Sequence, residues 1–366
     1  MAVNWRDLSH SNITTIQMIS QSNQTTVLGE LDGVDLSGSS ISMGYYTDTR
    51  QQAIIKTING NWKRGSFLKI IHKVPEWNYS KSLGLFAVQN DNASYGIAEI
   101  TPLQCVSMLY LESLDIATTP WVIAKNANST TVIRQLLNAS MRKYSIASDV
   151  KSGTFKGAYV LPAGESALSR YFTLCSLAGN RLDVNGDGVI TVNPYVAPKN
   201  KSVMWTFDLH DENGLINGGY SRSTNFFELP SRAVVYYEYQ DNKGNVKYIS
   251  QYSDVSSGDL SAATRGYRVV DFYQVDELNP QTASQALKLA KQRLSIDSSE
   301  MVQWELSNIP YVPLWEGDAV NLVVYDGPQR YIGTRKCFVK SIKINLGSYT
   351  MDLTLKEVTS PEEDDF

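Results

Sequence analysis

The stretch LDVNGDGVITVNPYVAP, residues 182–198, combines the start of a calcium-binding loop with the turn of a β-hairpin. From Asp183 onward, the acidic and amide residues DVNGD have the spacing of the first ligands of an EF-hand loop, and Gly188 stands at its sharp turn. The acid that such a loop needs at its last position is missing, because Pro194 stands there. The residues after Gly188 are β-branched, which favours a strand over a second helix. The stretch predicts a tight hairpin, and a weak calcium site at residues 183–188 is the alternative.

Two amphipathic helices are expected upstream of this hairpin. In NSTTVIRQLLNASMRKY, residues 128–144, Ser129 is the expected N-cap. In ESALSRYFTLCSLAGN, residues 165–180, Ser166 is the expected N-cap and Gly179 the stop. The predicted apolar stripes are Val132, Ile133, Leu136, Leu137 and Ser140 in the first helix, and Leu168, Tyr171, Phe172, Cys175 and Ala178 in the second.

Short β-rich runs separated by turn residues fill both ends of the chain. Between residues 13 and 100 they include ITTIQMIS, QAIIKTI, FLKIIHKV and LGLFAVQND, a spacing typical of a barrel or a sandwich. The segment TPLQCVSMLYLESLD is interpreted as a short helix or a closing strand, and Pro102 fits a helical first turn. After residue 200 the pattern returns, with RAVVYYEYQ and VKYISQY joined by the turn DNKGN.

One helix interrupts this second strand-rich part. NPQTASQALKLAKQRL places Ala283, Leu287, Ala290 and Leu294 on one face, and Pro280 precedes the start. Small side chains on the stripe suit close packing against a sheet. The helix at 281–294 is therefore expected to serve packing.

The composition limits the classes of partner. The 366 residues carry a net charge of -4 without a Lys/Arg cluster, which argues against a surface that grips nucleic acid through its phosphates. No signal peptide is recognised at the N-terminus, and no run of about 18 apolar residues predicts a membrane span.

Cys105, Cys175 and Cys337 lie far apart in the sequence and are expected as buried free thiols of a reducing compartment. The 21 tyrosines favour strands and assembly through aromatic interfaces.

No motif for catalysis or metal binding stands out. His10, His72 and His210 lie in neither HExxH nor HxH spacing, and the DLHD stretch at 208–211 is interpreted as a solvated loop pair. Ser166 lies in GESAL, which lacks the last glycine of GxSxG. No GxxxxGK[ST] phosphate loop is present, and spacing alone selects no glycosidase acid pair. We therefore assign no catalytic, cofactor-binding or metal-binding residue, expect no cofactor, and expect no enzymatic activity.

Four further stretches matter through their order along the chain. They are LKIIHKVPEW through SLGLFAVQND, the helix pair with the LDVNGDGVITVNPYVAP hairpin, ATRGYRVVDFYQVDELNPQTASQALKLAKQRL, and ELSNIPYVPLWEGDAVNLVV followed by SIKINLGSYTMDLTLKEV. In WEGDAV, which belongs to the last stretch, Gly317 is expected to tolerate a positive φ and Asp318 to accept backbone N–H groups. Taken in this order, the stretches resemble the tail hub or baseplate hub proteins of tailed bacteriophages, a family that includes late-control D-like proteins and the hubs of long non-contractile tails.

The resemblance implies an α+β, predominantly β fold with two tail-tube-like β-barrel domains and intervening helix-containing domains. The expected domains are a first barrel at 1–115, a helix-helix-hairpin domain at 116–199, a second barrel at 200–240 plus 305–358, a strand-helix insertion at 241–304, and a flexible acidic tail at 359–366.

The resemblance also implies a function. The chain is expected to be a structural virion protein, a homotrimeric hub at the tail tip that joins the hexameric tail tube to a threefold tip and lines the DNA ejection channel. Its implied partners are a distal tail or tail tube protein, a tape measure protein, and tail fibre or receptor-binding proteins, with DNA only in transit and no direct membrane span. It would be made in the bacterial host cytoplasm. The alternatives are a calcium-dependent carbohydrate-binding β-protein and a tail-associated cell-wall hydrolase.

Overall fold

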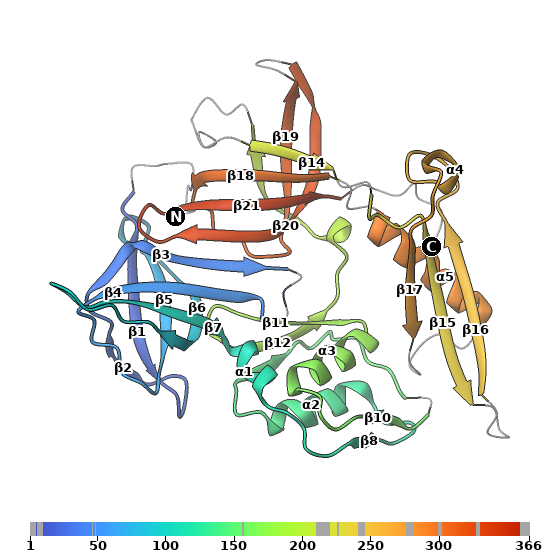
Figure 1. Ribbon diagram of the computed structural model, residues 1–366, viewed down its shortest axis with the longest axis horizontal. Helices are drawn as coiled ribbons and strands as arrows, with labels where there is room; N and C mark the ends of the chain where they lie inside the picture. Colours follow the sequence, from blue (N-terminus) through green and yellow to red (C-terminus); the bar gives the residue numbers. More distant parts are fainter. Residues whose placement is uncertain are drawn as a thin grey trace.

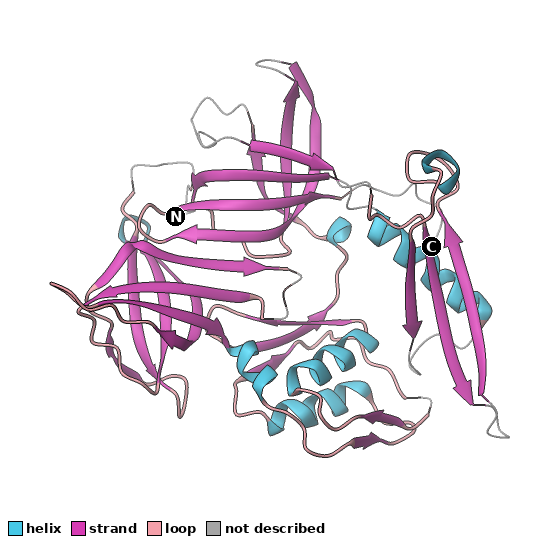
Figure 2. Cartoon of the chain, in the orientation of Figure 1, coloured by secondary structure: helices cyan, strands magenta, loops and turns pink. Residues whose placement is uncertain are grey.

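The fold is α+β and predominantly β, as expected (Figure 2). A computed structural model describes residues 5, 10–45, 47, 49–155, 157–209, 220–224, 227–240, 246–275, 282–298, 302–326 and 330–358. In this part of the chain no helix is long and apolar enough to cross a membrane.

Seven antiparallel strands form the N-terminal strand block. They are β1 (Ile13–Ser20), β2 (Val27–Glu30), β3 (Val34–Gly44), β4 (Gln51–Ile58), β5 (Ser66–Val74), β6 (Tyr79–Asp91) and β7 (Ile100–Ser107), with the short helix η1 (Pro75–Trp77) before β6. Their order in the sheet is β3-β4-β7-β6-β5-β1-β2. Residues 101–115 contain both predicted elements, because β7 runs directly into α1 (Met108–Leu114). Pro102 pairs with Lys56 in the strand, so its expected place in a helical turn is wrong.

A C-terminal strand block continues the same sheet. Its strands are β13 (Val203–Asp208), β14 (Tyr220–Thr224), β18 (Val302–Pro310), β19 (Ala319–Asp326), β20 (Arg330–Asn345) and β21 (Thr350–Glu357). β20 is long enough to pair with β19 along its first half and with β21 along its second. Its residues Ser341–Asn345 also pair with Ser40–Gly44 of β3. One ladder therefore joins the two strand blocks (Figure 1).

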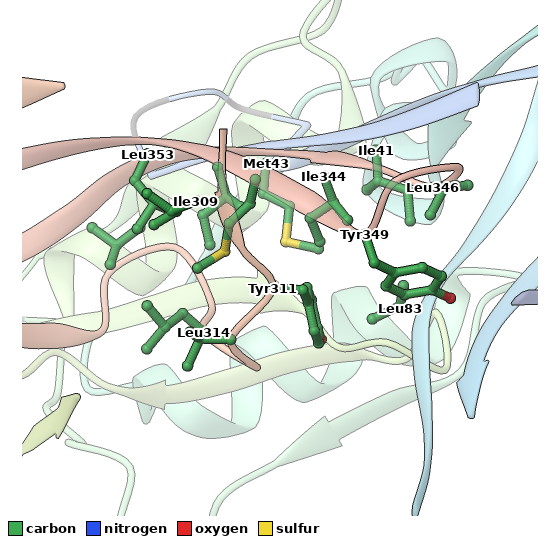
Figure 3. Packing of buried hydrophobic residues seen from close by; sticks show 14 of the residues in the cluster. Ile41, Met43, Leu83, Ile309, Tyr311, Leu314, Ile344, Leu346, Tyr349 and Leu353 are labelled. Atoms are coloured by element: carbon green, nitrogen blue, oxygen red, sulfur yellow. The ribbon is translucent and has the colours of Figure 1, made fainter. Parts of the chain in front are cut away.

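The two strand blocks also share one hydrophobic core. The residues that join β18 to β19 enter this core, where Tyr311 and Leu314 are buried (Figure 3). Met43 of β3 and Ile344 of β20 belong to the same cluster, as does Leu83 of β6. Because a continuous core and a continuous ladder both cross the boundary, the blocks are held in a fixed relation.

A helical module follows the N-terminal block. It contains β8 (Trp121–Ile123), α2 (Ser129–Ala139), β9 (Tyr144–Ile146), β10 (Tyr159–Leu161), α3 (Ala167–Leu177), β11 (Asn180–Val184), β12 (Ile190–Pro194) and η2 (Pro198–Asn200). The predicted cap of α3 is confirmed, since Ser166 accepts the N–H of Ser169 at 3.1 Å. The predicted cap of α2 is wrong by one residue: Asn128 accepts the N–H of Thr131, and Ser129 accepts the N–H of Gly153 instead.

The module packs on the outer side of the N-terminal block. Phe67, Leu85 and Val106, from β5, β6 and β7, share a buried cluster with Leu137 of α2 and Leu174 of α3. These strands thus bury one face in the core of the strand blocks and the other under the helices. The predicted apolar stripes of α2 and α3 belong to this cluster, except Ser140, which follows the last residue of α2.

An insertion lies between β14 and β18. It contains β15 (Arg232–Gln240), β16 (Val246–Asp254), α4 (Ala262–Arg265), β17 (Val270–Val275) and α5 (Ala283–Ser298). The strands form a separate sheet in the order β16-β15-β17, and α5 covers one face of it (Figure 1). Ala286 and Ala290 of α5 are buried against Val235, whereas Ala283 is exposed, so the predicted stripe is shifted. The hairpin β15–β16 is confirmed, while the turn DNKGN and Pro280 lie outside the described residues.

Candidate functional site: an interdomain junction

The DVNGDG stretch forms the turn of the β11–β12 hairpin. The Oδ1 atom of Asn185 accepts the N–H groups of Asp187 and Val189, both at 3.0 Å. Gly188 has φ +76°, a conformation that L-residues with side chains rarely adopt. The predicted hairpin is confirmed, and β12 pairs with β9 on its other side.

The carboxylates of this turn are engaged by cationic side chains. A carboxylate oxygen of Asp183 lies 3.1 Å from Nε of Arg50, and the other lies 2.6 Å from Nε of Arg181. A carboxylate oxygen of Asp187 lies 2.7 Å from the ammonium of Lys69. These acids therefore point to different cations instead of converging on one point. Among the described residues no group of three His, Cys, Asp or Glu side chains is arranged to hold a metal ion.

Both glycines of the turn allow it to touch the N-terminal block. A Cβ atom on Gly186 would lie 2.1 Å from the carbonyl oxygen of Ser82, and the hydroxyl of Ser82 donates to the Gly186 carbonyl at 2.5 Å. A Cβ atom on Gly188 would lie 2.7 Å from Leu85 and 3.0 Å from Met108. The hairpin is thus docked on β6 and α1 through its glycines.

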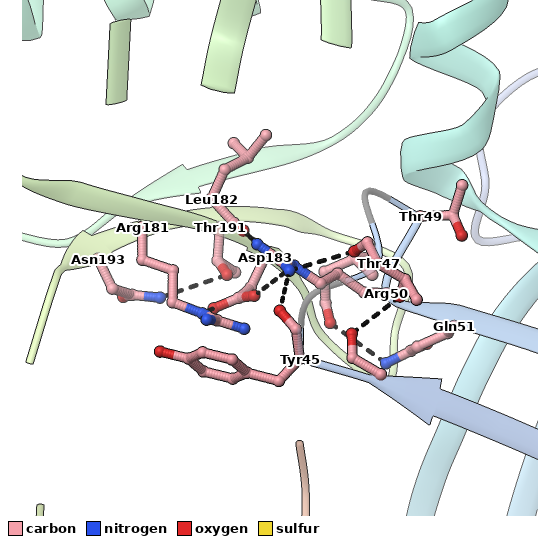
Figure 4. A network of polar contacts seen from close by, with 12 residues as sticks. Tyr45, Thr47, Thr49, Arg50, Gln51, Arg181, Leu182, Asp183, Thr191 and Asn193 are labelled. Carbon is pink, nitrogen blue, oxygen red and sulfur yellow. Dashed lines mark hydrogen bonds and ion pairs between the residues drawn. The ribbon is translucent and has the colours of Figure 1, made fainter. Parts of the chain in front are cut away.

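Arg50 ties the same hairpin to the connection between β3 and β4. Its guanidinium donates to the carbonyls of Tyr45 and Thr47 on its own side, and to the carbonyl of Leu182 across the junction at 3.2 Å (Figure 4). The guanidinium carbon of Arg181 lies 3.7 Å from the ring centroid of Tyr45. These contacts bury Arg50 and Arg181 next to Asp183. Removing one of these three side chains would therefore leave a buried charge without its partner.

The WEGDAV turn closes the junction from the C-terminal block. Gly317 has φ +82°, and a Cβ atom there would lie 2.6 Å from the ring of Tyr45. Asp318 accepts the N–H of Trp315 at 2.7 Å, and Lys201 donates to the carbonyl of Gly317 at 2.6 Å. The expected roles of Gly317 and Asp318 are therefore confirmed. Arg181, next to the DVNGDG stretch, and Gly317 of the WEGDAV turn lie far apart in the sequence, and both contact the ring of Tyr45.

Glu316 is the unusual member of this junction. Its side chain is buried, and neither carboxylate oxygen has a hydrogen-bond partner in the part of the chain that the structure describes. Burial, and next the negative charge of Asp183, raise its pKa to about 8, although Arg181 and Arg50 oppose this. The carboxyl group is therefore mostly protonated at pH 7.

The comparisons with known proteins agree with this architecture. Neither a protein-family model nor a curated protein matches the sequence. Among solved structures, a tail protein from Neisseria meningitidis matches with a TM-score of 0.67 and 9% identity over 94% of this chain and 96% of that one. A 43 kDa prophage tail protein from Shewanella oneidensis matches at 0.62 and 11% identity, over 96% and 99%. A prophage tail protein from Listeria monocytogenes matches at 0.57 and 10%, over 93% and 94%.

The chain has the fold of phage tail proteins. The similarity covers nearly the whole length on both sides, so it includes the strand blocks, the helical module and the insertion together. The resemblance noticed in the sequence is thereby confirmed for the fold.

Within this phage tail fold, the histidines considered as ligands lie apart from the junction. His72 is buried, with its ring 4.4 Å from Tyr349 and 4.8 Å from Tyr311 between centroids, and its Nε2 atom lies 2.8 Å from Asn12. Burial, and next His10, lower its pKa to about 4, so the ring is neutral at pH 7. His210 lies outside the described residues. The buried histidine fills the core between the strand blocks.

The cysteines behave as the sequence predicts. Cys105, Cys175 and Cys337 are free and buried. Burial raises the pKa of each thiol to about 12, which keeps all three protonated. They contribute to packing in the phage tail fold.

The roles of Arg50 and Tyr45 were not predicted, although both residues are central to the junction. Their partners lie more than a hundred positions away along the chain, at Leu182 and Arg181. The only local signal was a tyrosine and an arginine at the ends of a short β3–β4 connection. Such contacts depend on how the phage tail fold brings the segments together.

Proposed function

We propose that the protein is a structural component of a phage tail, a homotrimeric hub at the tail tip that joins a hexameric tail tube to a threefold tip. The observation that carries the proposal is the match of the whole architecture, over more than nine tenths of the chain, to two tail proteins with TM-scores above 0.6. A fold that is matched from end to end supports a role in the same kind of assembly.

Two strand blocks in one chain suit a protein that joins a sixfold tail tube to a threefold tip. If each block takes one position of a sixfold ring, three copies fill the ring. This requires the blocks to keep a fixed relation, and the pairing of Ser341–Asn345 with Ser40–Gly44 supports such rigidity. The junction around Tyr45 supports it further, because Arg50, Arg181 and Gly317 reach that ring or its backbone from three segments.

The division of the chain that we propose follows the strand pairing. The N-terminal block and the helical module keep the boundaries predicted from the sequence, near residues 115 and 199. The whole of β15 belongs with β16 and β17, so we place the start of the insertion before Arg232 and its end near Ser298. The C-terminal block then comprises β13, β14 and β18–β21.

We further propose that the trimer encloses a channel for DNA in transit. The net charge of -4 suits a wall along which phosphates slide, because a cationic wall would bind them through counterion release. The proposed partners are a distal tail or tube protein, a tape measure protein, and tail fibre or receptor-binding proteins. The role is structural, and the charged residues of the junction serve to hold segments together.

Localisation tests this proposal. An antibody raised against the purified protein should place gold particles at the end of the tail farthest from the capsid, in electron micrographs of particles released by the cells that encode it. A second antibody against the capsid protein of the same particles serves as the control. Labelling along the whole tail, or particles that assemble without the protein, would overturn the assignment to the tip.

A further inference from the structure

The insertion sheet has two faces of different character. Ala233, Val235 and Tyr237 of β15 are buried, and Val235 packs against α5. Because side chains alternate along a strand, Tyr236 and Glu238 point to the opposite face. That face is open: Tyr248 and Tyr252 of β16 are 69% and 54% exposed, and Phe272 of β17 is 59% exposed.

Aromatic rings cross this open face from strand to strand. The ring of Tyr236 lies 5.9 Å from that of Tyr248, nearly parallel to it at 20°, and 5.9 Å from that of Phe272. The β15–β16 pair of this sheet is antiparallel, and the solvated face of antiparallel strands usually carries polar side chains. A stripe of exposed aromatic residues instead is typical of an interaction surface, where tyrosine is enriched.

One end of the face already holds an arginine. The Nε and Nη2 atoms of Arg232 each donate to a different oxygen of Asp254 at 2.6 Å. The same guanidinium lies over the ring of Tyr252, with its carbon 4.0 Å from the ring centroid. Tyr252 and Asp254 are two positions apart on β16 and therefore share a face. The guanidinium of Arg232 is therefore held by an acid at its edge and a tyrosine ring at its face.

The other end of the face also holds an acid beside tyrosine rings. Tyr236 and Glu238 are likewise two positions apart on one strand, and the Tyr236 hydroxyl donates to Glu238 at 3.1 Å. Tyr248 lies directly opposite Glu238 in the β15–β16 ladder. No cationic side chain of the described residues pairs with Glu238. Within the described strands, Glu238 therefore places on this face a carboxylate that has no cationic partner among the described residues.

We propose that this end of the face binds an arginine side chain presented by a partner protein. The guanidinium would stack on Tyr248, which lies across the ladder from Glu238, and donate to Glu238. At the other end Arg232 likewise combines a tyrosine ring with a carboxylate, although its ring, Tyr252, lies on the same strand as its acid, Asp254. The exposed Phe272 would cover apolar residues that flank the arginine. Arginine is favoured over lysine because its planar fork matches a carboxylate beside an aromatic ring. The site belongs to the insertion sheet and does not depend on the proposed trimer.

The test uses the full chain labelled with 3-fluorotyrosine and the peptide N-acetyl-Leu-Arg-Leu-amide. The ¹⁹F signal of Tyr248, assigned through Tyr248→Phe, should shift in a saturable way with the peptide, and N-acetyl-Leu-Lys-Leu-amide should bind more weakly. Glu238→Gln should weaken binding at least about fivefold, because it removes a charge-assisted hydrogen bond. Glu30→Gln removes another exposed strand carboxylate and should leave binding unchanged.

A second variant tests the same idea by gain of binding. Arg232→Ala vacates the pair of Tyr252 and Asp254, so the variant should take up a second equivalent of the arginine peptide. Equal affinity of Glu238→Gln and the unchanged protein would overturn the proposal, as would the absence of saturable binding. A shift caused by the neutral glycan chitotetraose, but not by the peptide, would assign the face to carbohydrate and equally overturn it.

Discussion

Replacing Glu316 by glutamine should stabilise the protein at alkaline pH. The folded protein binds a proton at Glu316 up to about pH 8, whereas the carboxyl group of the unfolded chain, with its ordinary pKa of 4.5, has already lost it. Between these values the folded state binds more protons, so raising the pH through this range lowers the free energy of unfolding. The stability that the protonated Glu316 contributes is fully present below pH 4.5 and is lost above about pH 8.

The size of this effect follows from the two pKa values. At about 1.4 kcal/mol per pH unit, the interval from 4.5 to about 8 corresponds to about 5 kcal/mol. Glutamine has nearly the same shape and does not titrate. The Glu316→Gln variant should therefore match the unchanged protein near pH 4.5 and exceed its stability by up to this amount at pH 8.5, where the carboxylate would otherwise be a buried charge.

Urea denaturation followed by tryptophan fluorescence, at pH values from 5 to 9, measures this difference. Other groups contribute to the pH dependence of both proteins, so the quantity to compare is the difference between the two curves. Glu30→Gln, at an exposed position, is the matched control and should give a difference near zero throughout. A difference for Glu316→Gln that stays constant across this range would refute the reasoning, because it would mean that Glu316 is ionised in the folded protein.

Three further predictions concern the helical module. Gly186→Ala should destabilise the protein by more than about 2 kcal/mol in urea denaturation, because its Cβ would collide with the Ser82 carbonyl. The control Gly96→Ala, which has open space around it, should lower the free energy of unfolding much less. Equal effects of the two variants would argue against docking of the hairpin. Asn128→Ala should cost about 1 kcal/mol through loss of the α2 cap, and no loss of stability would contradict that cap. Millimolar calcium should leave the thermal midpoint unchanged, because the acids of residues 183–188 already bind cationic side chains; a clear increase would restore the calcium alternative.

Local signals in the sequence predicted the elements whose ends are fixed by their own residues. The helix α3 has a capping serine at 166 and a glycine at 179 with φ +71°, and both act within a few positions. The turn of the β11–β12 hairpin is similar, because Asn185 bonds to N–H groups two and four positions away. In α2 two neighbouring residues were both suitable caps, and a contact with Gly153 decided between them.

Long-range pairing was beyond reach of the sequence. Nothing in the residues of β20 indicates that its first half pairs with β19 and its second half with both β21 and β3. The shift of the α5 stripe has a similar cause, because Ala286 and Ala290 follow the position of Val235 on the sheet beneath. Arg50 was missed for the same reason: its role exists only once the hairpin has docked.

The mass of the assembled protein tests the central claim most directly. Native mass spectrometry of the purified full chain should give three times the chain mass of 40.8 kDa, and classified electron micrographs of the same sample should show threefold rings. The two strand blocks of each chain would then supply the six positions of the ring. A protein that stays monomeric at all concentrations, or that forms rings of another symmetry, would contradict the proposed hub.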